Sequence, residues 1–96
     1  LRVGPLGELS VDDGALMWRL HVQAATCLAN VLLPAMARAG RGRMVLVGSR
    51  VAQGMAGRSQ YAGVKAAEIA MARSWAAEVA TRGVTFNGRT TYNITR

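Results

Sequence analysis

A tyrosine, a lysine and a serine in the middle of the sequence are of types and spacing that could carry proton chemistry. Tyr61 and Lys65 are four residues apart, about one turn of an α-helix, so both side chains would project from one helix face. Ser49 stands at the end of a short apolar run, 12 residues before the tyrosine. A phenol beside an ammonium group and a hydroxyl could move a proton to or from a carbonyl or an alcohol.

The segments around these residues predict an α/β arrangement. Residues 11–38 show helical periodicity with a wide apolar arc. Residues 44–47 form a short apolar run bounded by glycines, as in a strand that is buried on both faces. A second helix is predicted over 60–81 and a second strand over 84–87. The order helix, strand, helix, strand favours a parallel sheet.

Single residues are expected to begin, end or bend these elements. Ser10 and Ser59 are expected to cap the two helices with their hydroxyl groups. Pro34 has no amide donor, so we expect it to kink the first helix or end it early, and Gly40 to stop it. Cys27 is the only cysteine of the chain, so no disulfide forms within it, and we expect this residue to be a small hydrophobic member of the core.

Composition and charge limit the classes of function. The 96 residues carry a formal net charge of +7, and 51% are hydrophobic but only 5% aromatic. The basic excess would suit nucleic acid, a membrane surface or a phosphate-bearing cofactor. The arginines are scattered and lack neighbouring aromatic residues for base stacking, so a solvated basic surface is favoured over nucleic-acid binding. No secretory signal and no bilayer-length apolar run is evident, so we predict a cytoplasmic chain with no membrane partner and no metal site.

The stretch from Gly40 to Lys65 resembles the short-chain dehydrogenase/reductase family, and in particular its bacterial 3-oxoacyl-carrier-protein reductase branch. The likeness includes LLPAMARAGRGRMVLVGS before the loop, YAGVKAAEIAMARSWAAEVATRGV after it, and Asn87 at the end of the second strand. It covers about residues 3–87. A Tyr-x-x-x-Lys pair alone is a weak signal, but within this ordered set of elements the signal is strong.

The resemblance implies a role for each candidate residue. Tyr61 would be the general acid and base of the reaction. Lys65 would bind the nicotinamide ribose of NAD or NADP and favour the tyrosinate by its charge, so that Tyr61 and Lys65 both contact the cofactor. Ser49 would hydrogen-bond the substrate oxygen. His21 stands where the family has an asparagine that belongs to a proton relay, and the sequence leaves open whether a histidine can replace it.

The resemblance also implies a partial Rossmann-like fold, that is, a fragment of a doubly wound parallel sheet. Residues 1–87 would be a segment of the C-terminal half of that domain, and residues 88–96 a divergent tail without regular structure. The family's glycine-rich cofactor motif is not found in the sequence, and GRTTYNITR stands where the family continues toward its substrate-binding region. We therefore expect a truncated or frameshifted copy that is inactive as an enzyme by itself.

Three functions remain open at this point. The first is the catalytic core of an NAD(P)-dependent oxidoreductase that transfers hydride between the cofactor and a small carbonyl or alcohol. The second is a non-catalytic association module, because in the family the helices that match 11–38 and 60–81 form the subunit interface, which implies a homo-oligomer. The third and weakest is a small basic nucleic-acid binder. Neither the substrate nor the choice between NAD and NADP follows from the sequence.

Overall fold

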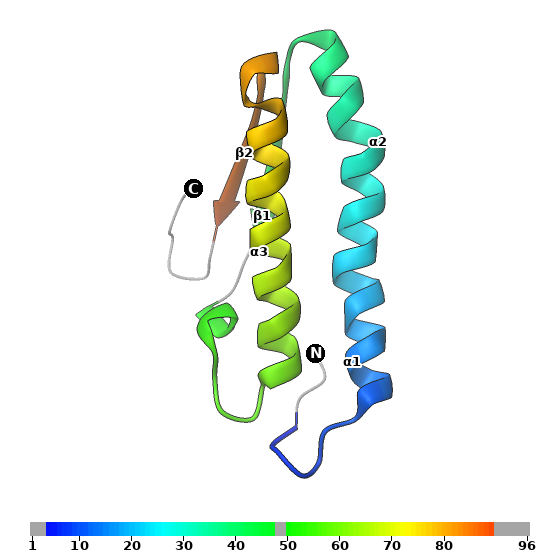
Figure 1. Ribbon diagram of the computed structural model, residues 1–96, viewed down its shortest axis with the longest axis vertical. Helices are drawn as coiled ribbons and strands as arrows, with labels where there is room; N and C mark the ends of the chain where they lie inside the picture. The colour runs from blue at the N-terminus through cyan, green and yellow to red at the C-terminus, as the bar shows by residue number, and fades with distance from the viewer. Residues whose placement is uncertain (1–3, 48–49, 90–96) are drawn as a thin grey trace.

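The computed structural model describes residues 4–47 and 50–89, which form two long helical segments side by side and a two-stranded sheet (Figure 1). The first helical segment is built from three consecutive elements, and the second is a single long helix that ends in a 3-10 turn. In chain order the elements are α1 (Val11–Met17), the π-helix η1 (Trp18–Gln23), α2 (Ala24–Ala39), β1 (Gly42–Val47), the 3-10 helix η2 (Arg50–Gln53), α3 (Ser59–Val79), the 3-10 helix η3 (Ala80–Arg82) and β2 (Val84–Arg89).

The two strands are parallel neighbours. Gly42 lies opposite Val84, and Val47 lies opposite Arg89. A parallel pair needs a long crossover connection, and α3 supplies it. The carboxyl end of β2 and the start of α3 point toward the same end of the molecule (Figure 1). The predicted order of elements and the parallel pairing are therefore confirmed within the described residues.

The second strand runs two residues farther than predicted. β2 ends at Arg89, because its backbone stays in register with β1 to the end of that strand. The first two residues of the predicted tail thus belong to the sheet. Residues 90–96, the rest of that tail, lie outside the described part of the chain.

The first helical segment is continuous, but its winding changes in the middle. Ser10 caps the segment as predicted, because its Oγ accepts a hydrogen bond from the amide of Asp13 at 3.1 Å. Trp18–Gln23 form a wider π-turn between α1 and α2, which no local sequence pattern had indicated. Gly40 ends the segment in the left-handed conformation with φ 73°, as expected of a glycine at this position.

Two residue-level expectations prove wrong, and a third is wrong in part. Pro34 does not end the helix early, because it lies inside α2, where the buried Leu33 and Ala37 on either side hold this part of the helix against the core. Ser59 is the first residue of α3 and makes no capping hydrogen bond, because the capping position falls on Arg58. Cys27 is exposed rather than a core residue, because it lies on the outer side of α2.

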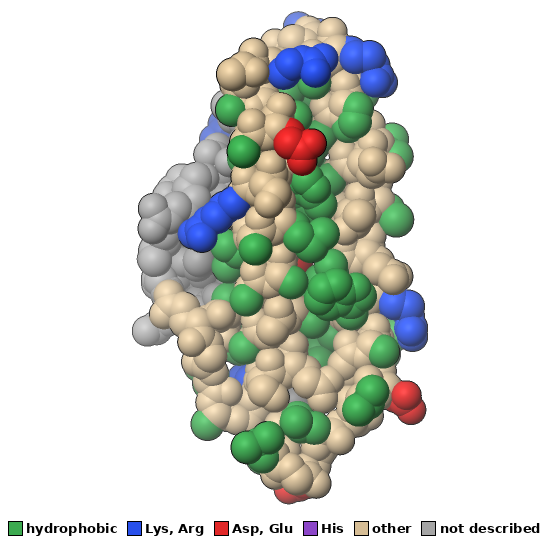
Figure 2. Space-filling model, in the orientation of Figure 1, with side chains coloured by type: hydrophobic (Ala, Val, Ile, Leu, Met, Phe, Trp, Pro, Cys, Tyr) green, Lys and Arg blue, Asp and Glu red, His purple; other side chains and the backbone are tan. Residues whose placement is uncertain are grey.

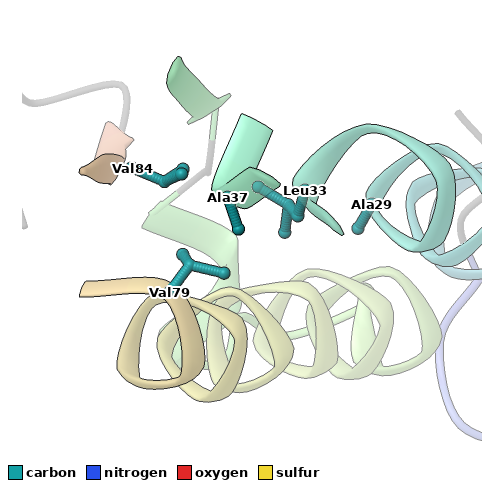
Figure 3. Packing of buried hydrophobic residues seen from close by; sticks show 5 residues of the cluster. All are labelled: Ala29, Leu33, Ala37, Val79 and Val84. Atoms are coloured by element: carbon teal, nitrogen blue, oxygen red, sulfur yellow. The ribbon is translucent and has the colours of Figure 1, made fainter. Parts of the chain in front are cut away.

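Two separate groups of buried side chains hold the layers together. In the first group, Ala37 and Val79 point toward each other across the space between α2 and α3, with Val84 of β2 beside them (Figure 3). The second group lies near the start of α3, where Val64 packs against Met17 and Val22 of the first helical segment. The π-turn therefore takes part in the second group through Val22, and the first group begins farther along the same helical segment, at Ala29.

The first helical segment differs from the expectation that the chain has no apolar run of bilayer length. Val11–Ala39 has a window of mean hydropathy 1.4 and is long and apolar enough to cross a membrane by length and composition. The core helix of a soluble protein passes the same test, and Met17, Val22 and Leu33 of this segment are buried against other elements. Apolarity alone therefore does not tell a lipid-facing helix from a protein-facing one here.

Candidate active site

The predicted tyrosine and lysine lie on one face of α3. Tyr61 is near the start of the helix and Lys65 follows one turn later. The Lys65 Nζ lies 5.7 Å from the centroid of the Tyr61 ring, and the lysine side chain is only 13% exposed. Because water screens this ammonium poorly, its charge acts more strongly on neighbouring groups than that of an exposed lysine. Tyr61 itself is partly buried.

The predicted serine lies outside the described residues. In the sequence, Ser49 comes two residues after the last residue of β1. Its contact with Tyr61 stays a prediction.

A histidine from the other helical segment reaches the tyrosine. The rings of His21 and Tyr61 meet edge to face, with centroids 6.2 Å apart and an interplanar angle of 83°. His21 belongs to the π-turn, and such single wide turns occur frequently at functional sites. The packing of α1 and η1 against α3 thus brings together two residues that are far apart in the sequence.

The fourth residue of the site was missed by sequence reasoning. Glu68 is 7% exposed, and its Oε1 lies 3.6 Å from the Lys65 Nζ and 3.7 Å from the His21 Nδ1. The same oxygen accepts no hydrogen bond from the residues that the structure describes. A signal existed, because Glu68 is three residues after Lys65 and seven after Tyr61, which places all three on one helix face.

His21, Tyr61, Lys65 and Glu68 are called the Tyr61 cluster below. The cluster combines one acid–base phenol, one shielded cation, one buried carboxylate and one imidazole that can carry either zero or one positive charge. Among residues 4–47 and 50–89, no three or more His, Cys, Asp or Glu side chains gather as metal ligands. The arrangement suits the transfer of a proton to or from an oxygen atom that is placed beside the phenol.

Comparison with known proteins shows which family shares this architecture. The family model described as short chain dehydrogenase matches residues 1–95. The 3-oxoacyl-[acyl-carrier-protein] reductase of Vibrio cholerae is 44% identical over 61 residues, which cover 62% of this chain and 25% of that protein. The reductase of the same name from Escherichia coli K12 is 39% identical over 61 residues. The chain thus spans about a quarter of the length of the curated relatives it matches.

Solved structures give the same result for the backbone. A short-chain dehydrogenase from Streptomyces avermitilis superposes with a TM-score of 0.87 at 31% identity, over 93% of this chain and 33% of that one. A structure from Beutenbergia cavernae, described as an NAD(P)-dependent gluconate 5-dehydrogenase with bound NADP, superposes with a TM-score of 0.88 at 30% identity, over 94% and 36%. Each neighbour is longer than this chain, so the likeness concerns the described helices and strands.

Proposed function

Since the chain belongs to the short-chain dehydrogenase family, we propose that its Tyr61 cluster performs the proton transfer that accompanies hydride exchange between NAD or NADP and a small carbonyl or alcohol. The observation that carries the proposal is the pairing of Tyr61 with the shielded ammonium of Lys65 on one face of α3, 5.7 Å from ring centroid to Nζ. A charge at this distance stabilises the phenolate that forms when the phenol gives up its proton.

Each residue has one task in the proposed reaction. In the direction of reduction, the Tyr61 hydroxyl donates its proton to the substrate oxygen as that oxygen gains negative charge, and in the direction of oxidation the phenolate takes the proton back. Lys65 stabilises the phenolate by its charge. Ser49, by the family resemblance, donates a hydrogen bond to the same substrate oxygen and fixes its position.

The donor set of the site fits the nicotinamide end of the cofactor. The Lys65 ammonium carries three N–H donors and no acceptor, which suits the ribose hydroxyl oxygens, and it lies beside Tyr61. Lys65 and Tyr61 would hold this part of NAD or NADP, and the bound cofactor supplies or accepts the hydride. The NADP-bound neighbour structure supports this class of cofactor without deciding between NAD and NADP for this chain.

The test asks whether the Tyr61 cluster catalyses the reaction when a longer relative supplies the rest of the domain. The 96-residue chain replaces the matching quarter of the Vibrio cholerae reductase, and oxidation of NADPH by the chimera is followed with a 3-oxoacyl substrate. We expect Tyr61→Phe to lower the rate at least about a hundredfold, because the phenol provides general acid catalysis. NADPH binding by the purified chain is measured in parallel.

A second tyrosine provides the matched control. The chain has two tyrosines, and Tyr92→Phe makes the same chemical change at a residue to which the proposed reaction gives no role. We expect this control to keep the activity of the unsubstituted chimera. Equal activity of the Tyr61→Phe and Tyr92→Phe chimeras would show that the phenol of Tyr61 is not the proton donor.

A second candidate function, association with another copy, is favoured by the apolar surface of the helices. A groove of about 410 Å³ runs between α2 and α3 and is lined by Leu33, Pro34 and Trp75 among others. Hydrophobic side chains gather in this valley (Figure 2). On α2, Leu28 and Val31 are 57% and 68% exposed. We propose that these faces pack against a second copy in the cytoplasm, so that protein and not lipid covers the apolar first helical segment.

A further inference from the structure

The Glu68 carboxylate lies at the centre of the Tyr61 cluster, and the proposed reaction gives it no role. Glu68 is 7% exposed, and its Oε1 accepts no hydrogen bond from the described residues. A buried carboxylate is strongly destabilising unless nearby charges compensate it. Two nitrogen atoms provide that compensation, the Lys65 Nζ at 3.6 Å and the His21 Nδ1 at 3.7 Å.

The two nitrogens come from different helical segments. Lys65 and Glu68 belong to α3, whereas His21 comes from the π-turn of the first segment. Glu68 Oε1 therefore joins the proposed catalytic lysine to the only histidine of the chain. The imidazole on the other side of this carboxylate also touches the Tyr61 ring. The four side chains thus form one connected set of contacts that includes the phenol.

We propose that Glu68 is a positioning residue that holds Lys65 and His21 against Tyr61, and that its charge offsets the charge of Lys65 beside the phenol. The proposal rests on the proposed function for the roles of Tyr61 and Lys65. The carboxylate lies 3.6 Å from the ammonium, so it weakens the attraction between Lys65 and a phenolate, and its removal favours the phenolate.

The direction of this effect follows from the groups that face the imidazole. Among the described residues, Glu68 and Tyr61 of α3 contact His21, and Lys65 lies on the far side of the carboxylate. The Nδ1 of His21 faces the carboxylate, so a proton on this nitrogen is favoured in the neutral ring as well as in the charged one. Removing the Glu68 charge leaves the Lys65 charge beside the phenol uncompensated.

The first measurement reads the histidine directly in the full 96-residue chain. Its single histidine makes the nitrogen-15 NMR signals of the imidazole unambiguous. Because the Nδ1 faces the carboxylate, we expect the neutral ring to carry its proton on Nδ1. Glu68→Gln is expected to lower the share of this tautomer at least about twofold, whereas Glu78→Gln, an exposed glutamate on the same helix, leaves it unchanged.

The second measurement reads the phenol. In a Tyr92→Phe background, the ultraviolet absorbance of tyrosinate reports Tyr61 alone. We expect Glu68→Gln to lower the pH at which half of the tyrosinate absorbance has appeared by about half a unit or more, since a neighbouring carboxylate has been removed. Glu68→Asp keeps the charge and is expected to behave like the unsubstituted chain. If Glu68 had a purely structural role, Glu68→Asp and Glu68→Gln would change the pH dependence of the tyrosinate absorbance equally.

The NMR and absorbance measurements do not depend on catalysis, so they can overturn the role of Glu68 without overturning the proposed function. Loss of activity on Tyr61→Phe in the chimera judges the function, and the NMR and absorbance results judge Glu68. A His21 tautomer ratio equal to that of free histidine in the unsubstituted chain would overturn the positioning role. So would a Glu68→Gln chain whose tyrosinate absorbance follows the same pH curve as that of Glu78→Gln.

Discussion

Burial of the Glu68 carboxylate is unfavourable, and the charged side chain of Lys65 beside it compensates for part of that cost. Lys65 and Glu68 are both largely shielded from water, with side chains 13% and 7% exposed. Burying two charges costs free energy that their attraction repays only in part, whereas leaving one of them alone costs more. The pair is therefore expected to contribute to the chemistry of the site more than to the stability of the fold.

A pair of substitutions tests this balance. Lys65→Met and Glu68→Leu are each expected to lower the free energy of unfolding by about 1–3 kcal/mol, because each leaves an uncompensated charge. The double variant Lys65→Met/Glu68→Leu is expected to regain the stability of the unsubstituted chain or exceed it. Urea denaturation followed by circular dichroism measures all four chains. Additive losses in the double variant would mean that the two charges do not share one environment.

Sequence reasoning recovered part of the site at this scale. The Tyr61 and Lys65 pairing could be predicted because residues four apart on a helix always share a face. Glu68 could have been placed on the same face by the same rule, but its burial depends on the first helical segment that packs over it. The position of Ser49 relative to these residues is still a prediction.

Helix-to-helix contact explains why one glycine lies inside α1. From sequence alone, Gly14 only weakens the first turns of a helix. In the structure, a Cβ at this position would overlap the side chain of Gln60. Gln60 Nε2 donates a hydrogen bond to the backbone carbonyl of Ser10 at 3.0 Å, which ties the start of α3 to the start of α1. The glycine is thus needed for the close approach of the two helices near Tyr61.

The matching prediction compares two glycines. Gly14→Ala is expected to lower the free energy of unfolding by about 1–2 kcal/mol, because the overlap with Gln60 outweighs the higher helix propensity of alanine. Gly63→Ala on α3 has nothing within 4 Å of the added carbon, so we expect it to raise that free energy by about 0.5–1 kcal/mol. Thermal or urea unfolding gives both values. A stabilising Gly14→Ala would contradict the contact.

Elements that depend on local pattern were predictable, and those that depend on packing were not. The periodicity of residues 11–38 and the glycine at 40 are local signals, and both agree with the structure. The π-turn Trp18–Gln23 has no such local signal, and its residues His21 and Val22 contact α3. Pro34 stays within α2 because tertiary packing outweighs its local preference.

The whole molecule is thin, with extents of 49 × 26 × 16 Å. Among the described residues, two strands and two helical segments leave one broad face of the helices without a covering layer (Figure 1). Exposed apolar side chains of the first helical segment include Leu20, Leu28 and Val31. Contiguous exposed apolar surface is typical of protein–protein contacts. The shape and the surface chemistry therefore agree with the proposed association of two copies.

Sedimentation velocity tests this association. We expect the chain to self-associate at micromolar concentration, and Leu28→Glu to raise the dissociation constant at least about tenfold, because it places a charge in the apolar contact. Met55→Glu is the control, since Met55 is also 49% exposed but lies in the loop before α3. A monomeric unsubstituted chain, or an equal effect of both substitutions, would argue against the helices as the contact surface.

At this scale the sequence indicated an α/β chain with a parallel sheet, and the described strands and helices agree with that expectation. It could not indicate which faces stay open, because exposure depends on how elements far apart in the chain pack. Cys27 is an example, since its helical spacing suggested the core and the structure places it on the outside.

The π-turn also limits how this sequence could change its length during evolution. A π-turn corresponds to one extra residue in an α-helix, so deleting one residue from Trp18–Gln23 would leave a regular helix of nearly the same length. The wide turn takes up the extra residue within one revolution, so this deletion is expected to keep Leu33 facing Val79 and Met17 facing Val64. A deletion within the regular turns of α1 or α2 would instead rotate the following residues by about 100°. The loss of one residue is therefore expected to be tolerated better at the π-turn than elsewhere in this helical segment.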